Sequence, residues 1–413
     1  ILVGNMPLMI KPTKDCKTIV VANEARAFGS TNSFQNPLGS VGIIRFTNGV
    51  ENNYEYTELN FTKFNDKQTD LEKEGVRFVF RENTFDRDIE PESITFNCDE
   101  TIAYVALQEN NAIAIVDVRK LEIDEIKGLG YKTWDKYTLD TSDKDGGIHM
   151  NNYDFIRSFY LPDRIKYHHW NDEGIIITAD EGAYKSYSNS FNEKRRGNWF
   201  NPGKSLSKRY LIAIENFSCR LGRLFFSKLD GLDNTRKYEN LYFYGGRGFT
   251  IRKASDMSIL FDSGDTIERK ISELAPEIFN SNYKGGQSIN QQRDTQSDNK
   301  GPECEAVETA EIDGKLVILL GCERPGTIVV FSVGDDFKET KFEYLYFNIP
   351  EYDKRLKHLY TKRKISEINP ENFKYVGFDK SPNGQNILFV VGKSTGTLSA
   401  IDVDVEKWSK EMP

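Results

Sequence analysis

A short apolar phrase recurs along the chain, and its repetition constrains the fold more than any other feature of the sequence. Each copy is a run of apolar residues that ends in a small polar residue and then, in four of five copies, glutamate. The copies are Ile19–Glu24, Ala103–Glu109, Ile175–Glu181, Val317–Glu323 and Ile387–Lys393. The surrounding strands alternate with a period of two, which excludes an α-solenoid. Repetition of one unit predicts a repeat architecture.

The phrase belongs to a larger unit of short strands. A proline followed by an alternating segment precedes each copy, and in all but the first copy an acidic residue follows that proline. These prolines are Pro7, Pro91, Pro162, Pro302 and Pro370. A second alternating strand follows the phrase, as in Ala112–Asp117 and Thr397–Asp402, with turn signals such as Pro382-Asn383-Gly384 between strands. Three or four antiparallel strands per unit predict the blades of a β-propeller.

We therefore expect an all-β fold in which residues 1–413 form a single propeller of four-stranded antiparallel blades. Units are predicted to start near residues 7, 91, 162, 221, 302 and 370, and the unit from Leu221 to Asp262 is diverged. Ile1–Gly4 resembles the last strand of a preceding blade, so N-terminal blade sequence is expected to be missing. Seven blades are predicted, with eight as the alternative. The polar residues 281–300 are predicted to form a long loop over one face.

Charge, cysteines and sequons bear on partners and compartment. The net charge of −8 argues against nucleic-acid or anionic-membrane partners and is compatible with cations. No apolar run approaches membrane-spanning length. Cys304 and Cys322 lie on the first two strands of one unit, close enough for a disulfide. Asn60 and Asn216 begin N-x-[ST] sequons. Together these features favour an extracellular or cell-surface protein.

Repetition also predicts where acidic side chains gather. Equivalent positions on successive blades form a ring around the axis, so acids that recur by blade are expected to converge at one channel mouth. The phrase supplies Glu24, Glu109, Glu181 and Glu323, and the residues linked to the prolines are Glu92, Asp163, Glu303 and Glu371. Hard oxygen ligands favour Ca²⁺ or Mg²⁺. The alternative is an internal salt-bridge ring that includes Arg247, Arg324 and Lys393.

Two further features are candidate sites. The loop Asp140–Gly147 carries Asp140, Asp143 and Asp145 ahead of two glycines, a pattern that can wrap Ca²⁺, although it lacks EF-hand spacing. A solvated loop is the alternative. Arg247 has a planar guanidinium that could hold an anion, or it could join acids of adjacent blades.

Several phrases, taken in order along the chain, resemble one family. They are Asn36–Val41, Leu107–Ala112, Ser142–Gly147, Thr178–Gly182, Phe261–Asp265 and Asp298–Glu303. The match extends from about Pro7 to Asp402 and is similar to the choice-of-anchor I family. The resemblance implies an extracellular propeller, with animal members linked to biomineralisation and some bacterial members labelled phosphatases. The chain departs from the family pattern at Ala25, Asp180, Cys304 and Lys393.

Two functional classes follow. In the first, the chain is a non-catalytic extracellular propeller that binds a protein or matrix partner, or copies of itself, with Ca²⁺ as a structural or bridging ion. In the alternative, the acid ring holds the metal of a phosphoesterase and an arginine holds the substrate. The sequence contains four histidines and no G-x-S-x-G, P-loop or H-E-x-x-H motif, which favours the first class.

Overall fold

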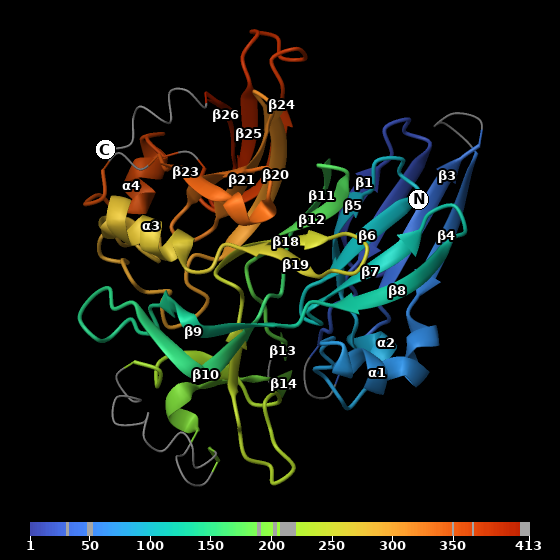
Figure 1. Cartoon of the computed structure of the whole chain (residues 1–413), viewed down its shortest axis with the longest axis horizontal. Helices are drawn as coiled ribbons and strands as arrows, with labels where there is room; N and C mark the ends of the chain where they lie inside the picture. The colour runs from blue at the N-terminus through green and yellow to red at the C-terminus, as the bar shows by residue number, and fades with distance from the viewer. Residues whose placement is uncertain are drawn as a thin grey trace.

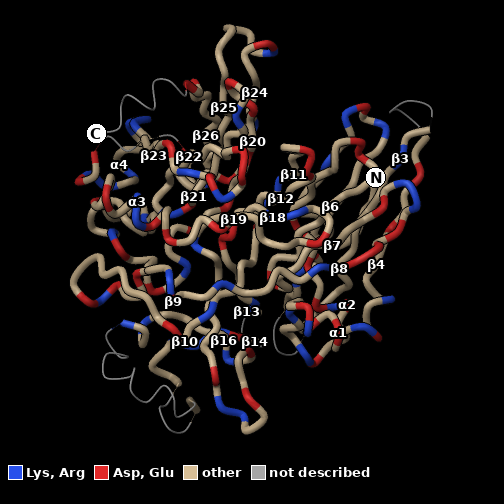
Figure 2. The backbone as a smooth tube through the Cα atoms, viewed as in Figure 1, with Lys and Arg blue, Asp and Glu red and all other residues tan. Residues whose placement is uncertain are grey.

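The computed structural model describes residues 1–29, 33–47, 53–187, 191–200, 205–206, 220–348, 351–365 and 367–404. Within these ranges the chain is mostly strand, and five sheets follow one antiparallel plan (Figure 1). Acidic and basic residues are interspersed over all of the sheets (Figure 2).

Four of these sheets consist of strands that are consecutive in the chain. The first contains β1 (Pro7–Pro12), β2 (Thr18–Asn23), β3 (Ser40–Phe46) and β4 (Tyr54–Asn60). The second contains β5 (Pro91–Phe96), β6 (Ile102–Leu107), β7 (Ala112–Asp117) and β8 (Glu122–Gly128). The fourth contains β20 (Cys304–Ile312), β21 (Lys315–Cys322), β22 (Thr327–Val333) and β23 (Lys341–Tyr346). The fifth contains β24 (Pro370–Val376), β25 (Ile387–Gly392) and β26 (Thr397–Asp402).

A long insertion interrupts the third sheet. The prediction that Leu221 to Asp262 form a separate unit was wrong, because the last strands of that segment belong to this sheet. Its strands are β11 (Ile165–Trp170), β12 (Glu173–Asp180), β18 (Gly248–Lys253) and β19 (Ile259–Asp262), paired in that order. The strands expected to form one diverged unit therefore belong to three different sheets. The pairing of β12 with β18 joins segments about seventy residues apart, from Ile175↔Lys253 to Asp180↔Gly248, so local alternation does not reveal it.

The insertion and the segment before β11 form smaller sheets of their own. The strand β10 (Asn151–Phe159) pairs antiparallel with β9 (Tyr131–Leu139) and parallel with β17 (Leu241–Tyr244). Two short pairs are β13 (Ser186–Tyr187) with β14 (Phe191–Asn192), and β15 (Lys194–Arg196) with β16 (Phe225–Ser227). In Figure 1, β9, β10, β13 and β14 lie together, below the other sheets in that view.

Helices are short and lie between strands. The α-helices are α1 (Gln68–Lys73), α2 (Phe85–Asp88), α3 (Thr266–Leu274) and α4 (Leu356–Thr361). The 3₁₀ turns are η1 (Thr62–Lys67), η2 (Gly197–Trp199), η5 (Pro276–Ile278) and η6 (Phe337–Glu339). Among the described residues, no helix has the length and apolar character needed to cross a membrane.

The core explains why the recurring phrase is apolar. Each copy forms the second strand of its sheet, and alternate residues face the two neighbouring sheets. Val105 packs against the first sheet, whereas Tyr104 and Ala106 pack against the third. In β21, Ile318 packs toward the third sheet and Leu319 toward the fifth. Strands buried on both faces read as continuous apolar runs, and apolar layers between successive sheets are the packing of a β-propeller.

The expectation for the N-terminus was wrong in one detail. Ile1–Gly4, predicted as the last strand of a preceding blade, forms no strand, and the first strand begins at Pro7. A ring of seven or eight blades and a single domain over residues 1–413 stay predictions.

Candidate functional site

The first strands of the five sheets lie next to one another around a common axis. In order, β1 contacts β5, β5 contacts β11, β11 contacts β20, and β20 contacts β24. The backbone N–H of Ile165 donates to Oγ of Ser93 at 3.2 Å, and the N–H of Tyr167 donates to Oγ1 of Thr95 at 2.9 Å. Residues at the same end of these strands are therefore brought to the same end of the axis.

Four of these first strands have an irregular register near their first residue, and this irregularity determines which side chains face the axis there. The pairing of β1 shifts between Pro7 and Met9, and that of β24 shifts between Pro370 and Asn372. Similar shifts occur in β5 between Pro91 and Ile94 and in β20 between Cys304 and Ala306. A β-bulge re-aims the side chain of the extra residue. The residues that follow the first position are Leu8, Glu92, Glu305 and Glu371, and all four line one pocket.

This pocket, which we call the acidic mouth, has a volume of about 340 Å³. Seven carboxylates line it: Glu24, Glu92, Glu109, Asp163, Glu181, Glu305 and Glu371. Four basic residues line it as well: Arg26, Arg164, Lys300 and Lys393. Six of the eight acids that recur by blade in the sequence thus lie at one mouth. The other two, Glu303 and Glu323, adjoin it through Glu181.

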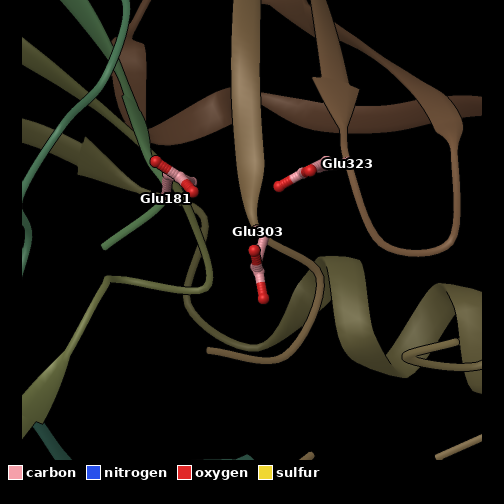
Figure 3. Close-up of side chains that lie close together, drawn as sticks. All are labelled: Glu181, Glu303 and Glu323. Carbon is pink, nitrogen blue, oxygen red and sulfur yellow. The ribbon is translucent and has the colours of Figure 1, made fainter. Parts of the chain in front are cut away.

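Glu181, Glu303 and Glu323 form the tightest group of carboxylates (Figure 3). One carboxylate oxygen from each side chain lies within 4.8 Å of the other two. Among the described residues this is the one set of three or more metal-ligating side chains at such spacing. Oxygen atoms at this separation fit the coordination shell of one hard cation.

Internal cations offset part of this charge. The ammonium group of Lys300 forms ion pairs with Glu181 and, at 3.1 Å, with Glu303. Arg324 lies 2.7 Å from Glu323. Arg324 thus makes a pair that the salt-bridge alternative expected, and Lys300 adds a cation that the sequence did not single out.

Lys393 acts on other acids of the mouth, because its ammonium group lies 2.8 Å from Glu371 and 3.7 Å from Oε1 of Glu305. The lysine that replaces the phrase glutamate in the fifth sheet therefore pairs with the bulged acid of the same sheet.

Two glutamates at the mouth keep unpaired oxygens. Glu109 is 5% exposed and Glu305 is 4% exposed, and Oε2 of each is buried without a hydrogen-bond donor. Burial, followed by the charge of Glu90, raises the pKa of Glu109 to about 8. Burial, followed by the charges of Asp163 and Glu181, raises the pKa of Glu305 to about 12. A buried acceptor without a partner is costly, so these oxygens have capacity for a ligand.

The strand register of the fourth sheet also differs from the expected one. Cys304, not Pro302, occupies the position equivalent to Pro370 of the fifth sheet. Cys304 pairs with Cys322 as Pro370 pairs with Gly392, so Glu305 is the equivalent of Glu371. Glu303 instead takes the place of Asn369, and the two share a left-handed backbone, with φ of 47° and 53°. Glu303 follows Pro302 in the sequence, but the prediction that it is equivalent to Glu371 was therefore wrong. The alternating segment Cys304-Glu305-Ala306-Val307 carried the signal for the correct register.

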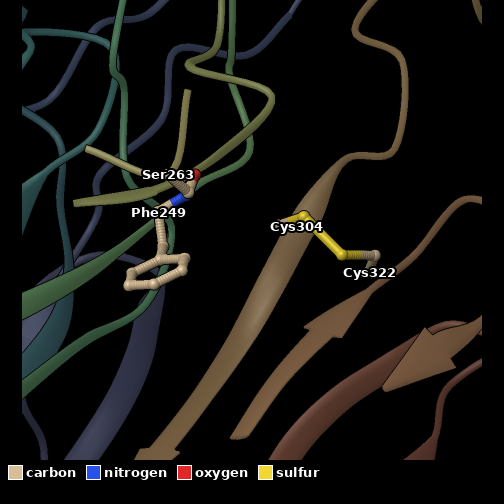
Figure 4. The surroundings of a disulfide bond; sticks show 4 residues. All are labelled: Phe249, Ser263, Cys304 and Cys322. Atoms are coloured by element: carbon tan, nitrogen blue, oxygen red, sulfur yellow. A yellow bond between two sulfur atoms is a disulfide. The ribbon is translucent and has the colours of Figure 1, made fainter. Parts of the chain in front are cut away.

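The predicted disulfide between Cys304 and Cys322 is confirmed (Figure 4). The two cysteines are directly opposite on β20 and β21 and belong to the same apolar cluster as Phe249 of β18. Cys304 follows Glu303 and Cys322 precedes Glu323, so the bond holds the backbones of two clustered glutamates together. Cys16 and Cys98 are exposed free thiols, and Cys219 lies outside the described residues.

The three aspartates of the loop Asp140–Gly147 each have different surroundings and do not form one ligand set. Asp140 is buried and accepts hydrogen bonds from the N–H groups of Ser142 and His149, at 3.1 and 2.7 Å. Asp143 pairs with Arg223 at 2.8 Å. Asp145 has one buried oxygen without a partner. The loop is therefore organised by its own backbone and by an arginine, and Ca²⁺ binding there stays a prediction.

Arg247 makes structural contacts. Its buried guanidinium lies 2.8 Å from Glu268 and donates to the carbonyl oxygens of Asp140 and Ser297, at 2.7 and 2.8 Å. It thus joins α3 to the predicted long loop, and these contacts occupy both terminal nitrogens.

The two sequons differ in what the structure describes. Asn60 is exposed at the end of β4, and its Oδ1 accepts from the N–H of Thr62 at 3.1 Å. Asn216 lies outside the described residues.

Comparison with known proteins gives matches along most of the chain. The choice-of-anchor I domain model matches residues 1–336. Gigasin-3a of Magallana gigas is 32% identical over 196 residues, which cover 48% of this chain and 69% of that protein. The mesenchyme-specific cell surface glycoprotein of Strongylocentrotus purpuratus is 29% identical over 354 residues, which cover 76% of this chain and 45% of that protein. Among solved structures, the periplasmic gluconolactonase of Pseudomonas aeruginosa is similar at a TM-score of 0.37 and 10% identity, covering 97% of this chain and 82% of that chain.

Proposed function

The chain belongs to the choice-of-anchor I domain family, and from this premise we propose that it is a non-catalytic propeller of the cell surface or extracellular space that binds Ca²⁺ at its acidic mouth. The name of the sea-urchin relative, a cell surface glycoprotein, supports the location, as do the disulfide and the exposed sequon at Asn60. The ion is structural, or it bridges the mouth to an anionic group of a protein or matrix partner.

The observation that carries the proposal is the carboxylate set of Glu181, Glu303 and Glu323. Three converging carboxylates supply hard oxygen ligands in the number and spacing that Ca²⁺ accepts, and bound water or a partner can complete its coordination of six to eight oxygens. Glu305 adjoins this group, because burial and then the charges of Asp163, Glu181 and Glu323 raise its pKa, and its Oε2 has no hydrogen-bond partner.

Lys300 and Arg324 lower the affinity without abolishing the site. Each contributes one positive charge, whereas Glu181, Glu303 and Glu323 supply three carboxylates. A divalent ion would therefore improve the balance of charge where the internal cations leave an excess of acid. Displacement of the Lys300 ammonium from Glu181 and Glu303 would free two ligands.

Melting of the purified protein in calcium and in chelator tests this proposal. At about a hundred times its dissociation constant, a ligand of the folded state stabilises by roughly 3 kcal/mol, so we expect a higher melting temperature in calcium. The double variant Glu181→Gln with Glu323→Gln removes two ligands and should lose most of this response. Glu109→Gln together with Glu181→Gln should weaken it.

The matched control is Glu55→Gln, which removes the same charge from an exposed position on β4. This variant should respond to calcium as the native chain does. Identical melting of the native chain in calcium and chelator would mean that the lysines and arginines of the mouth hold its acids together without the ion.

A hydrolysis assay distinguishes the phosphoesterase alternative from the non-catalytic assignment. Hydrolysis of p-nitrophenyl phosphate that chelator abolishes and Glu181→Gln removes would replace the non-catalytic assignment. We expect calcium binding with no such turnover.

A further inference from the structure

The same five strands that form the acidic mouth form a second pocket at their other ends. This pocket, which we call the basic mouth, has a volume of about 530 Å³. The acidic mouth is lined by the second residues of β1, β5, β20 and β24, and by Asp163 and Arg164 just before β11. The basic mouth is lined by later residues of all five first strands, among them Lys11, Phe96, Lys166, Glu311 and Lys374. The two pockets therefore lie at opposite ends of the first strands.

Basic groups outnumber acidic groups at this end. Four lysines line the pocket, Lys11, Lys14, Lys166 and Lys374, against the two acids Glu100 and Glu311, and His168 and His169 line it as well. The acids already have partners. Both carboxylate oxygens of Glu100 accept from the N–H of Lys14, at 3.0 and 2.9 Å, and Glu311 lies 3.1 Å from Nε2 of His168.

Three of the lysines come from three different sheets. Lys166 of β11 forms an ion pair with the buried Glu308. Lys11 of β1 and Lys374 of β24 have no carboxylate within ion-pair distance among the residues that the structure describes. Burial, and then the charges of Lys166 and Lys374, lower the pKa of Lys11 and outweigh the opposite effect of Glu308 and Glu100. The ammonium groups therefore repel one another, and a bound anion would relieve that repulsion.

We propose that the basic mouth binds a small oxyanion, a phosphate or sulfate group, held by Lys11, Lys166 and Lys374. Each ammonium group offers three hydrogen-bond donors, and charge-assisted bonds to phosphate oxygens are among the stronger polar contacts in proteins. The group arrives either as the free ion or as an ester on a sugar. The first strands then carry a cation site at one end and an anion site at the other.

Calorimetric titration of the whole chain with inorganic phosphate, inorganic sulfate and glucose 6-phosphate tests this proposal. Lys374 is exposed, so Lys374→Gln should fold normally, and we expect it to weaken binding roughly tenfold, as the loss of one charge-assisted contact does. The double variant Lys11→Gln with Lys374→Gln should weaken binding further.

Lys357→Gln serves as the matched control, because it removes an exposed charge on α4, away from the pocket. Tighter binding of glucose 6-phosphate than of phosphate identifies an ester as the natural ligand, and equal or weaker binding identifies the free ion. Absence of binding by the native chain, or equal weakening by Lys357→Gln and Lys374→Gln, overturns the proposal. Glu181→Gln with Glu323→Gln should leave anion binding unchanged, which separates this test from that of the calcium site.

Discussion

The ammonium nitrogen of Lys300 lies 3.1 Å from Oε2 of Glu303, three residues further along the chain. Lys300 ends the segment predicted as a long loop, residues 281–300, and its side chain is also paired with Glu181 of the third sheet. The segment therefore delivers to the acidic mouth a cation that holds two of the candidate calcium ligands.

Removal of this cation should strengthen calcium binding. We expect Lys300→Met to bind calcium roughly tenfold more tightly, because the ion no longer competes with an ammonium group for Glu181 and Glu303. The same variant should melt at a lower temperature in chelator, since buried carboxylates lose their counter-ion. Calorimetry and thermal melting check both effects. Lys284→Met, an exposed lysine of the same segment, is the control, and equal calcium affinity in the two variants would contradict the competition.

The disulfide should contribute to stability and to calcium affinity. The cysteines are 18 residues apart, and a loop of about that size predicts a loss of roughly 3 kcal/mol when Cys304 and Cys322 are both changed to serine. Urea denaturation measures the loss, and calorimetry should show weaker calcium binding because Glu303 and Glu323 are no longer held together. Cys16→Ser, at an exposed free thiol, should change neither quantity.

The stability of the fold should depend on pH through Asp294. Burial, followed by the charges of Asp140, Asp145 and Asp143 that face it, raises the pKa of Asp294 to about 8. An unfolded aspartate has a pKa of about 3.9, so between these values the folded state binds a proton that the unfolded state releases. The contribution of Asp294 to stability is therefore fully present below about pH 4 and is lost as the pH rises toward 8.

Asp294→Asn should remove this dependence. Asparagine keeps the oxygen that accepts from Ser297 and tolerates the positive φ of 72° at this position. We expect the variant to be more stable than the native chain by several kcal/mol at pH 8 and to lose that advantage at pH 4. Urea denaturation at both pH values measures it, and a difference that is the same at pH 4 and pH 8 would contradict the assignment.

Asn60 should carry a glycan when the chain passes through a eukaryotic secretory pathway. Its side chain is exposed at the end of β4, and its sequon begins a turn where the transferase has access. The intact mass of the native chain should fall after deglycosylation. In Asn60→Gln, the part of this mass decrease that comes from the glycan on Asn60 should be absent. Thr62→Ser preserves the sequon and should preserve the glycan, whereas a native mass unaltered by deglycosylation would refute the prediction.

The recurring phrase was sufficient to predict the strands that matter most for the fold. All five copies form the second strand of a sheet, because burial on both faces demands an apolar run that local sequence displays. Pairing over long distances was not visible. In the third sheet, the strand Gly248–Lys253 pairs with the strand that ends at Asp180. These strands are far apart in the sequence, so only tertiary contacts select the pairing.

The acidic mouth was predicted better than its internal counter-ions. Acids at equivalent positions must converge if the fold repeats, so Glu24, Glu109 and Glu181 could be placed from sequence. Lys300 belongs to no repeated position, and nothing local marks a lysine that folds back over the axis. The position of Glu305 could have been predicted from the alternating segment that begins at Cys304. Pro302 obscured it, because this proline lies two residues before the position that a proline occupies in the fifth sheet.

The bulge at the start of the first strands has a consequence for how such mouths diversify. In four of the five sheets it presents a side chain to the acidic mouth while the rest of the strand stays paired, and in the first sheet that side chain is Leu8. A substitution at one such position changes the ligand chemistry without disturbing a neighbouring blade. Descendants of one ancestral propeller could therefore acquire different specificities through single codon changes, each of them tolerated by an unchanged scaffold.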